Sequence, residues 1–238
     1  MPGRLLLVAT PIGNLEDLSP RAAKALADAD LVACEDTRHT GKLLAHLGIR
    51  KRLVSLHEHN ERRRIPELVA ALERGETVAV ASDAGTPLVS DPGYPLTRAA
   101  IAAGARVEPI PGPSALLAAL VTSGLPPYPF TFAGFPPPKS GKRRTFYRRF
   151  GGLGHTLVVY ESPHRLAASL DDAIAELGPD RPAALARELT KLHEEVVRGT
   201  LSELAAWAAS RQILGELVLV VGSEGDAAAG PTRNEAAP

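Results

Sequence analysis

The chain has 238 residues, 45% of them hydrophobic, so it can bury two modest α/β domains or one large one. Its 27 basic and 27 acidic residues give zero formal net charge, which argues against a general nucleic-acid binder, since such proteins carry a basic excess. A single cysteine, Cys34, excludes internal disulfides, and no stretch has the length and apolarity of a transmembrane helix, so a cytoplasmic location is expected.

Short apolar runs alternate with helix-like runs along the first half of the chain. The pair Ser19-Pro20 is a typical helix start, and Gly48 and Gly75 lie where two later helices should end. Continuous apolar strands separated by helices are typical of a mainly parallel sheet that is covered on both faces. The expected strands are residues 4–10, 31–35, 53–56, 77–82 and 107–110, and the expected helices are 20–29, 40–47, 66–74 and 96–103.

A second α/β pattern follows a break rich in glycine and proline at residues 124–129, which comes after an expected helix at 115–123. We therefore predict an N-terminal domain at 1–115, a linker region at 116–129, a C-terminal domain at 130–223 and a disordered tail at 224–238. The C-terminal domain should have strands at 130–135, 156–161, 183–188, 195–199 and 216–221 and helices at 164–177 and 201–210.

Four loops that follow predicted strands of the first domain are rich in glycine, proline and small polar residues: 10–14, 35–38, 82–93 and 111–114. In an open α/β sheet the carboxyl ends of parallel strands meet at one edge, where ligands bind. Any one of these loops could be a simple turn. Four of them at one predicted edge favour a ligand site that offers backbone N–H groups and a close approach to the main chain.

Several familiar site types are absent from the sequence. It contains no G-x-x-x-x-G-K-[ST] phosphate loop, no G-x-G-x-x-G dinucleotide fingerprint and no G-x-S-x-G nucleophile elbow. His57 and His59 flank Glu58 and would share one face of a strand, but no third ligand accompanies them. We therefore expect no bound metal.

A basic segment lies between the first two strands of the second domain. Phe146, Tyr147 and Phe150 alternate with the cations there, a pattern suited to stacking bases and binding phosphates. A solvated amphipathic helix would show the same pattern. The predicted RNA-binding residues are Lys139, Lys142, Arg143, Arg144, Arg148 and Arg149.

Eight motifs in order resemble one protein family over nearly all of residues 4–222. They are VATPIGNLEDLSPRA, ACEDTRHTGKLL, SDAGTPLVSDPG, PGPSA, GFPPPK, YESPHR, ARELTKLHEE and GELVLVV. In these motifs the chain resembles the small-subunit ribosomal RNA methyltransferase I family of the tetrapyrrole methylase superfamily. The resemblance implies an enzyme with S-adenosylmethionine (SAM) as its cofactor, which methylates the ribose 2′-oxygen of a cytidine in the decoding centre of 16S rRNA, within the 30S subunit.

The resemblance also implies two α/β domains of the tetrapyrrole methylase type, SAM in the cleft between them, and a homodimer that binds neither membrane nor DNA. Asp36, Arg38 and Lys191 are catalytic candidates, although Asp36 and Arg38 could equally form an ion pair that fixes their loop. The cofactor-binding residues that the resemblance implies are Pro11, Gly13, Ser82, Asp83, Ala84, Gly85, Thr86, Ser90, Asp91, Ser114, Ala115, Tyr160, Arg187, Glu188 and Leu189.

Two other functions remain open. A small-molecule methyltransferase of the same superfamily, acting on a tetrapyrrole such as a precorrin, would share the fold and cofactor but needs a roomy apolar cleft and no basic segment. An RNA-binding assembly factor that makes little use of SAM would not need the strand-end loops. The longer family members continue with a basic helical segment after the final strand. The fifteen residues at 224–238 do not match it, so the basic segment would carry more of the phosphate binding.

Overall fold

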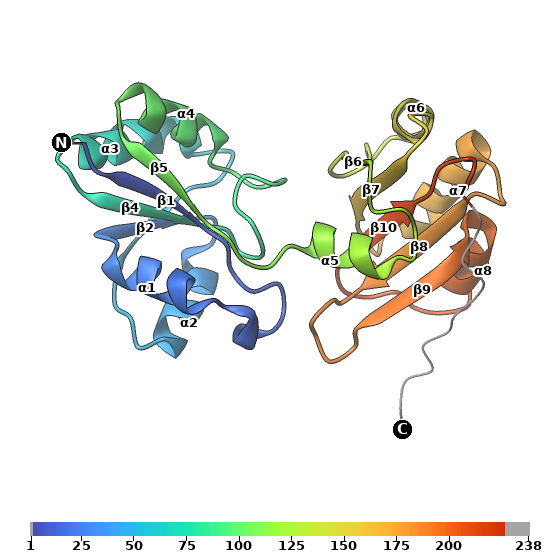
Figure 1. Ribbon diagram of the computed structural model, residues 1–238, viewed down its shortest axis with the longest axis horizontal. Coiled ribbons are helices and arrows are strands. Elements are labelled where there is room, and N and C mark those ends of the chain that lie inside the picture. The colour runs from blue at the N-terminus through green and yellow to red at the C-terminus, as the bar shows by residue number, and fades with distance from the viewer. Residues whose placement is uncertain (1, 227–238) are drawn as a thin grey trace. The chain divides into compact units, whose positions relative to one another are not determined.

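The protein divides into two compact units, one formed by Met1–Ser114 and the other beginning at Ala115 (Figure 1). The structure is a computed structural model that describes residues 2–226. Most of the predicted tail, from residue 227 onward, lies outside the described residues. Within residues 2–226, no helix is both long enough and apolar enough to cross a membrane.

The first unit is built on a sheet of five parallel strands in the order β3-β2-β4-β1-β5. Strand β2 is buried along its whole length, which explains why the sequence reads there as a continuous apolar run. The predicted parallel sheet is confirmed. The strands are β1 (Arg4–Val8), β2 (Leu31–Cys34), β3 (Arg52–Ser55), β4 (Thr77–Ala81) and β5 (Arg106–Ile110).

Helices cover both faces of this sheet (Figure 1). Leu5 and Leu6 are neighbours in β1 and point to opposite faces. Leu5 lies in one core with Leu68 and Leu96, and Leu6 lies in another with Leu26. Burying one leucine side chain of this kind stabilises the fold by about 1.5–3 kcal/mol. The helices are η1 (Leu15–Asp17), α1 (Pro20–Asp28), α2 (Thr37–His46), α3 (Glu61–Glu73) and α4 (Tyr94–Ala102).

The second unit holds a mixed five-stranded sheet in the order β6-β7-β10-β8-β9. Strand β6 runs parallel to β7, and the other neighbouring strands are antiparallel. Because β7 and β8 are both antiparallel to β10, their carboxyl ends lie at the same edge of the sheet. The strands are β6 (Phe130–Phe132), β7 (Thr156–Glu161), β8 (Pro182–Arg187), β9 (Glu195–Thr200) and β10 (Leu217–Val221).

One core unites three helices of the second unit with its sheet. Tyr147, Leu170 and Leu204, each from a different helix, pack in this core with Leu219 of β10. Another helix, α5, contacts β7 and β10. The helices are α5 (Ala115–Thr122), α6 (Ser140–Gly151), α7 (Leu166–Leu177) and α8 (Leu201–Ala209).

Two helices begin three or more residues earlier than expected, and the region assigned as a linker contains a helix that belongs to the second unit. Helix α2 begins three residues early because the Asp36 side chain accepts a hydrogen bond from the backbone N of Arg38 and caps it. Helix α3 begins at Glu61, so Pro66, expected to start the helix, lies inside it. The expected linker region at 116–129 contains most of α5, which is apolar enough to pack on the second sheet.

Candidate functional site

Three loops of the first unit are held together at the carboxyl ends of β1, β4 and β5. Thr10 and Gly85 exchange two backbone hydrogen bonds, with N···O distances of 2.9 and 3.0 Å. The Thr10 hydroxyl donates to the carbonyl of Ser82 at 3.0 Å, and the Thr86 hydroxyl donates to the carbonyl of Pro113 at 3.3 Å. The structure therefore brings together three of the four strand-end loops singled out in the sequence.

The loop after β4 has an unusual backbone. Gly85 and Gly93 have φ angles of 79° and 121°, which glycine adopts without a steric penalty. Leu88 and Ser90 also have positive φ angles, 72° and 67°, where a side chain costs roughly 1–2 kcal/mol. The buried Glu61 carboxylate accepts a hydrogen bond from the backbone N of Gly93 at 2.9 Å and anchors the end of the loop. The surrounding contacts thus impose this loop conformation.

Asp83 connects this loop to the fourth one, which follows β2. Its carboxylate accepts a hydrogen bond from the backbone N of Asp36 at 3.1 Å. Asp36 itself pairs with the guanidinium of Arg38 at 2.7 Å and accepts from the backbone N of Arg38 at 2.8 Å. These hydrogen bonds to Arg38 hold the pKa of the Asp36 carboxyl well below its usual range. Such a carboxylate is a weak proton acceptor, so the geometry favours an organising role for Asp36 and Arg38.

Acidic side chains gather where these loops meet. Burial, and then the negative charge of Glu35, raise the pKa of Asp91 to about 6, and Asp83 adds to the effect although a hydrogen bond to Ser82 opposes it. Burial also raises the pKa of Glu35, followed by the charge of Asp83. These carboxylates repel one another across this edge of the sheet. A bound cation would relieve that repulsion, so this edge is suited to a positively charged ligand.

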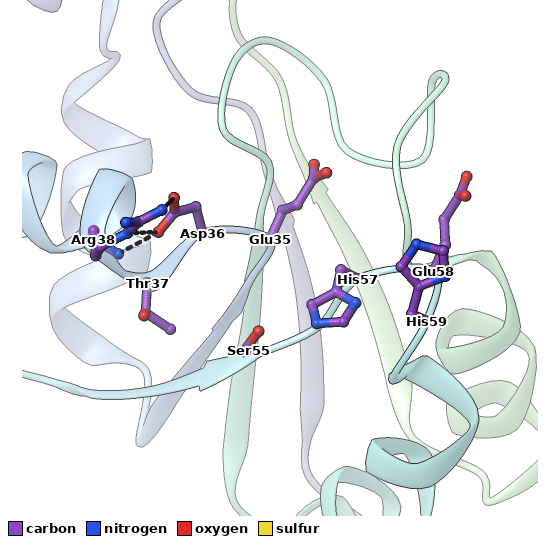
Figure 2. A pocket seen from close by; sticks show the side chains of 8 residues that line it. All are labelled: Glu35, Asp36, Thr37, Arg38, Ser55, His57, Glu58 and His59. Carbon is purple, nitrogen blue, oxygen red and sulfur yellow. Dashed lines mark hydrogen bonds and ion pairs between the residues drawn. The ribbon is translucent and has the colours of Figure 1, made fainter.

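A pocket of about 500 Å³ opens beside these loops, at the ends of β2 and β3 (Figure 2). Figure 2 shows Glu35 between the Asp36–Arg38 pair and His57, with Glu58 and His59 beyond. Only Asp36 and Arg38 were predicted as site residues. The strand-end rule could have found the rest, because Glu35 directly follows β2 and His57 lies two residues after β3. The pocket is lined by Glu35, Asp36, Thr37, Arg38, Ser55, His57, Glu58 and His59.

The histidines of this pocket do not belong to a metal cluster. Within the part of the chain that the structure describes, no group of three or more His, Cys, Asp or Glu side chains could hold a metal ion. His57 and His59 meet edge to face, with ring centroids 6.0 Å apart. They therefore offer aromatic surface and ring nitrogens to an organic ligand.

The remaining cofactor candidates among residues 1–115 follow β1 or β4, or lie where the two units join along the chain. Pro11 and Gly13 follow β1, and Ala84 lies in the loop after β4. Ser114 is the last residue of the first unit, and Ala115 begins α5 of the second.

In the second unit, the predicted residues of β7 and β8 lie at one sheet edge. Tyr160 pairs with Val218 of β10, and Arg187 pairs with the adjacent Leu217. The Tyr160 ring packs against Phe132 and Phe135, with centroid distances of 4.9 and 5.5 Å. This edge therefore carries an aromatic cluster next to a strand end, which is a surface suited to a flat ring.

The turn after β8 contains Glu188, Leu189 and Lys191. Glu188 has a positive φ of 50°, and its carboxylate accepts hydrogen bonds from Lys191 at 2.8 Å and from the backbone N of Glu216 at 2.9 Å. Burial lowers the pKa of Lys191, but its bonds to Glu188 and Glu216 outweigh it, so the net pKa is raised. An ammonium that holds its proton more tightly cannot serve as a base, and Lys191 instead fixes this turn.

The basic segment forms α6, preceded by Lys139, and its cations differ in environment. Arg143 is only 4% exposed, and its Nη2 lies 2.7 Å from the Asp172 carboxylate of α7. Arg144 and Arg148 are exposed and share the Glu176 carboxylate at 2.6 and 2.7 Å. The prediction that Arg143 binds RNA is therefore corrected, because its side chain lies inside the unit and joins α6 to α7.

Comparison with known sequences gives a family for the chain. Residues 4–205 match the model of the Tetrapyrrole (Corrin/Porphyrin) Methylases. The chain is 55% identical to the "Ribosomal RNA small subunit methyltransferase I" of Mycobacterium tuberculosis, over 92% of this chain and 77% of the relative. It is 48% identical to the protein of that name from Escherichia coli O157:H7, with the same coverage.

Solved structures share the fold. The uroporphyrin-III-C-methyltransferase of Thermus thermophilus superposes with a TM-score of 0.63 at 26% identity, covering 92% of this chain and 94% of that one. A conserved hypothetical protein from Aeropyrum pernix superposes with a TM-score of 0.71 at 21% identity, covering 94% and 86%. The chain therefore belongs to the tetrapyrrole methylase family and, within it, to the ribosomal RNA small subunit methyltransferase I family of enzymes.

Proposed function

We propose that the protein is a SAM-dependent methyltransferase that methylates the ribose 2′-oxygen of a cytidine in the decoding centre of 16S rRNA. The observation that carries this proposal is the 55% identity, over 92% of the chain, to enzymes named ribosomal RNA small subunit methyltransferase I. A structure of a Thermus thermophilus uroporphyrin III methyltransferase of the same fold is complexed with S-adenyl homocysteine, which supports a SAM-derived ligand here.

The joined loops of the first unit fit such a cofactor. SAM supplies an activated methyl group on a positively charged sulfonium. The negative charges of Asp83 and Asp91 would attract that positive charge. The glycines of these loops let the backbone approach a ligand closely. We therefore retain as the proposed cofactor residues of this unit Pro11, Gly13, Ser82, Asp83, Ala84, Gly85, Thr86, Ser90, Asp91 and Ser114.

The second unit supplies the other proposed cofactor residues. The aromatic cluster around Tyr160 is suited to the adenine ring, since aromatic faces stack on flat heterocycles. Ala115 and the strand-end residues Arg187, Glu188 and Leu189 complete the proposed set. That SAM lies in a cleft between two domains stays a prediction.

Asp36, Arg38 and Lys191 are proposed as positioning residues rather than as proton acceptors. Asp36 is already engaged by Arg38, and Lys191 by two carboxylates. Asp36 and Arg38 would hold the loop after β2, and Lys191 would hold the turn after β8. If a carboxylate removes the proton of the ribose hydroxyl, it is therefore a different one from Asp36.

The proposed phosphate-binding residues are the exposed cations of α6 and the lysine that precedes it, namely Lys139, Lys142, Arg144, Arg148 and Arg149. Replacing Arg148 and Arg149 together by alanine should weaken 30S binding and flatten its salt dependence, by about 0.7 in the log–log slope for each phosphate that is no longer neutralised. Filter binding over a range of salt concentrations measures this slope. The exposed pair Arg50 and Arg52, at the amino end of β3, provides the matched double-alanine control, which should keep the original slope. Equal slopes in both variants would remove α6 from the RNA interface.

One assay separates the proposed substrate from its rivals. Protein and methyl-labelled SAM are incubated with 30S subunits, naked 16S rRNA or a precorrin-type tetrapyrrole, and the label is then located. We expect label in a 30S subunit or its 16S rRNA, on a cytidine ribose that resists alkaline cleavage at its 3′ side. Label in the tetrapyrrole alone would favour the small-molecule methyltransferase. Binding of the subunit without any transfer would favour an assembly factor.

Two further properties are proposed on the family resemblance, namely a homodimer and a cytoplasmic location. Sedimentation equilibrium should give twice the chain mass of 25.1 kDa. A mass of one chain at micromolar concentration would exclude the dimer.

A further inference from the structure

We propose that the pocket at the ends of β2 and β3 receives the target nucleoside, and that Glu35 accepts the proton of its ribose 2′-hydroxyl. This inference rests on the proposed methyl transfer to RNA and names the substrate site within it. Neither the family resemblance nor the comparisons assign Glu35 or this pocket a role. Figure 2 shows the residues concerned.

Strand order places this pocket next to the proposed cofactor loops. In the sheet order β3-β2-β4-β1-β5, the cofactor loops follow β4, β1 and β5, whereas the pocket is formed after β2 and β3. Strand β2 is hydrogen-bonded to β4, and the Asp36–Asp83 hydrogen bond of 3.1 Å joins their loops. One half of the sheet edge is thus available to the cofactor, and the adjoining half to the group that receives the methyl.

The pocket contains the kinds of group that recognise a nucleoside in RNA. Unstacked bases bind to aromatic side chains, and the rings of His57 and His59 provide such surface. A carboxylate accepts hydrogen bonds from the exocyclic amine of cytosine, and Glu58 supplies one. The side chain of Arg38 is 87% exposed at the other end of the pocket, where it can meet a phosphate. A volume of about 500 Å³ is within the usual range for small-ligand sites.

Glu35 is the carboxylate of this pocket best suited to take a proton. The pKa of Glu35 is raised, first by partial burial and then by the negative charges of Asp83 and Glu58. His57 opposes this rise, and Asp36 adds to it. The charge of Glu35 in turn raises the pKa of Asp91, a further acidic neighbour. A carboxyl with a raised pKa is a stronger base than Asp36, whose pKa is lowered by Arg38.

The proposed step balances in atoms and charge. The ribose 2′-oxygen forms a bond to the methyl carbon as its proton passes to a carboxylate oxygen of Glu35, and the electron pair of the broken S–C bond remains on sulfur. The carboxylate loses its negative charge as the sulfonium loses its positive one. Water can then carry the proton from Glu35 to solvent, because the side chain is only partly buried.

The first test replaces Glu35 by glutamine. We expect kcat to fall by at least about 100-fold, the usual minimum contribution of a general base. The affinity for SAM, measured by calorimetry, should stay within threefold of wild type. At saturating SAM, the wild-type kcat should decline toward acid pH as Glu35 becomes protonated, and this decline should be missing from the residual kcat of Glu35→Gln. Glu73→Gln, at the exposed end of α3, is the matched control and should keep the wild-type rate and pH profile.

A second test does not depend on turnover. Short single-stranded RNA containing cytidine is titrated into the wild-type protein, and the imidazole NMR signals of His57 and His59 are followed, assigned through His→Ala variants. Both signals should shift, whereas the signal of His46, at the opposite end of α2 from the pocket, should not. Unmoved His57 and His59 signals would overturn the pocket assignment. A wild-type rate in Glu35→Gln would overturn its role as base while leaving the rRNA methylation intact, and absence of transfer by the wild-type protein would instead refute the proposed function.

Discussion

Asp172→Ala should destabilise the second unit by about 3–5 kcal/mol, because it leaves the Arg143 guanidinium buried without its carboxylate. Asp172 accepts hydrogen bonds from Nε of Arg143 at 2.7 Å and from the Ser140 hydroxyl at 2.8 Å. The guanidinium also donates to the backbone carbonyls of Pro138 and Ala168. The buried Arg143 guanidinium thus holds α6 against α7. Removing Asp172 either leaves that cation buried without a carboxylate or forces it out into water.

Urea unfolding followed by tryptophan fluorescence measures this loss. Trp207 is the single tryptophan of the chain and packs against the core of the second unit, so its signal reports on that unit. Arg144→Ala is the control, since it removes a half-exposed cation from the same helix and should cost less than about 1 kcal/mol. Equal shifts in the two variants would contradict the distinction between a structural and a surface arginine on α6.

The strands could be predicted because their signal is local. A strand buried on both faces must be apolar along its length, and β7 was predicted with the bounds that the structure gives. The first residues of helices were harder to predict from the sequence. Helix α3 begins at Glu61 and not at Pro66, after a turn in which the Asn60 side chain accepts a hydrogen bond from the backbone N of His57 at 2.9 Å and donates to the carbonyl of Ser55 at 3.1 Å. Proline is typical of a first helical position, so the sequence favoured a start at Pro66 over these side-chain contacts.

The candidate site was predictable in its location and less so in the roles of its side chains. The strand-end rule places the loops at one edge, as found. The sequence could not tell that Asp36 is occupied by Arg38 while Glu35, the preceding residue, faces a pocket. It could not tell that Arg143 turns inward among exposed arginines, because its partner lies 29 residues away on α7. Charge is visible in a sequence, whereas the neighbour that neutralises it is not.

SAM should bind more weakly as the pH falls through about 6, and S-adenosylhomocysteine should show a smaller loss. Burial and the charge of Glu35 raise the pKa of Asp91 to about 6 in the ligand-free protein. Above that pH its carboxylate attracts the sulfonium, and below it the carboxyl is neutral. Because the homocysteine product has no sulfonium charge, it gains less from the ionised form. Linkage limits the difference to about tenfold per pH unit below pH 6, and calorimetry with both ligands from pH 5 to pH 8 measures it.

Asp91→Asn supplies the complementary test, because the same carboxylate should weaken the ligand-free fold. A folded-state pKa above the ordinary value means that ionisation favours the unfolded chain, so stability is lost as the pH rises from about 4 through 6. The variant should therefore melt at a higher temperature than wild type at pH 7.5 and at the same temperature near pH 4. Its preference for SAM over the homocysteine product should no longer depend on pH.

Asp17→Asn, an exposed control in the same unit, should change neither property. A variant that lost affinity for both ligands equally, at every pH, would mean that Asp91 holds the loop and does not meet the sulfonium. The ligand-free protein thus keeps a repulsion between Asp91 and Glu35 that lowers its stability, and the same negative charge favours binding of the cationic ligand. Such a trade between stability and function is common at binding sites.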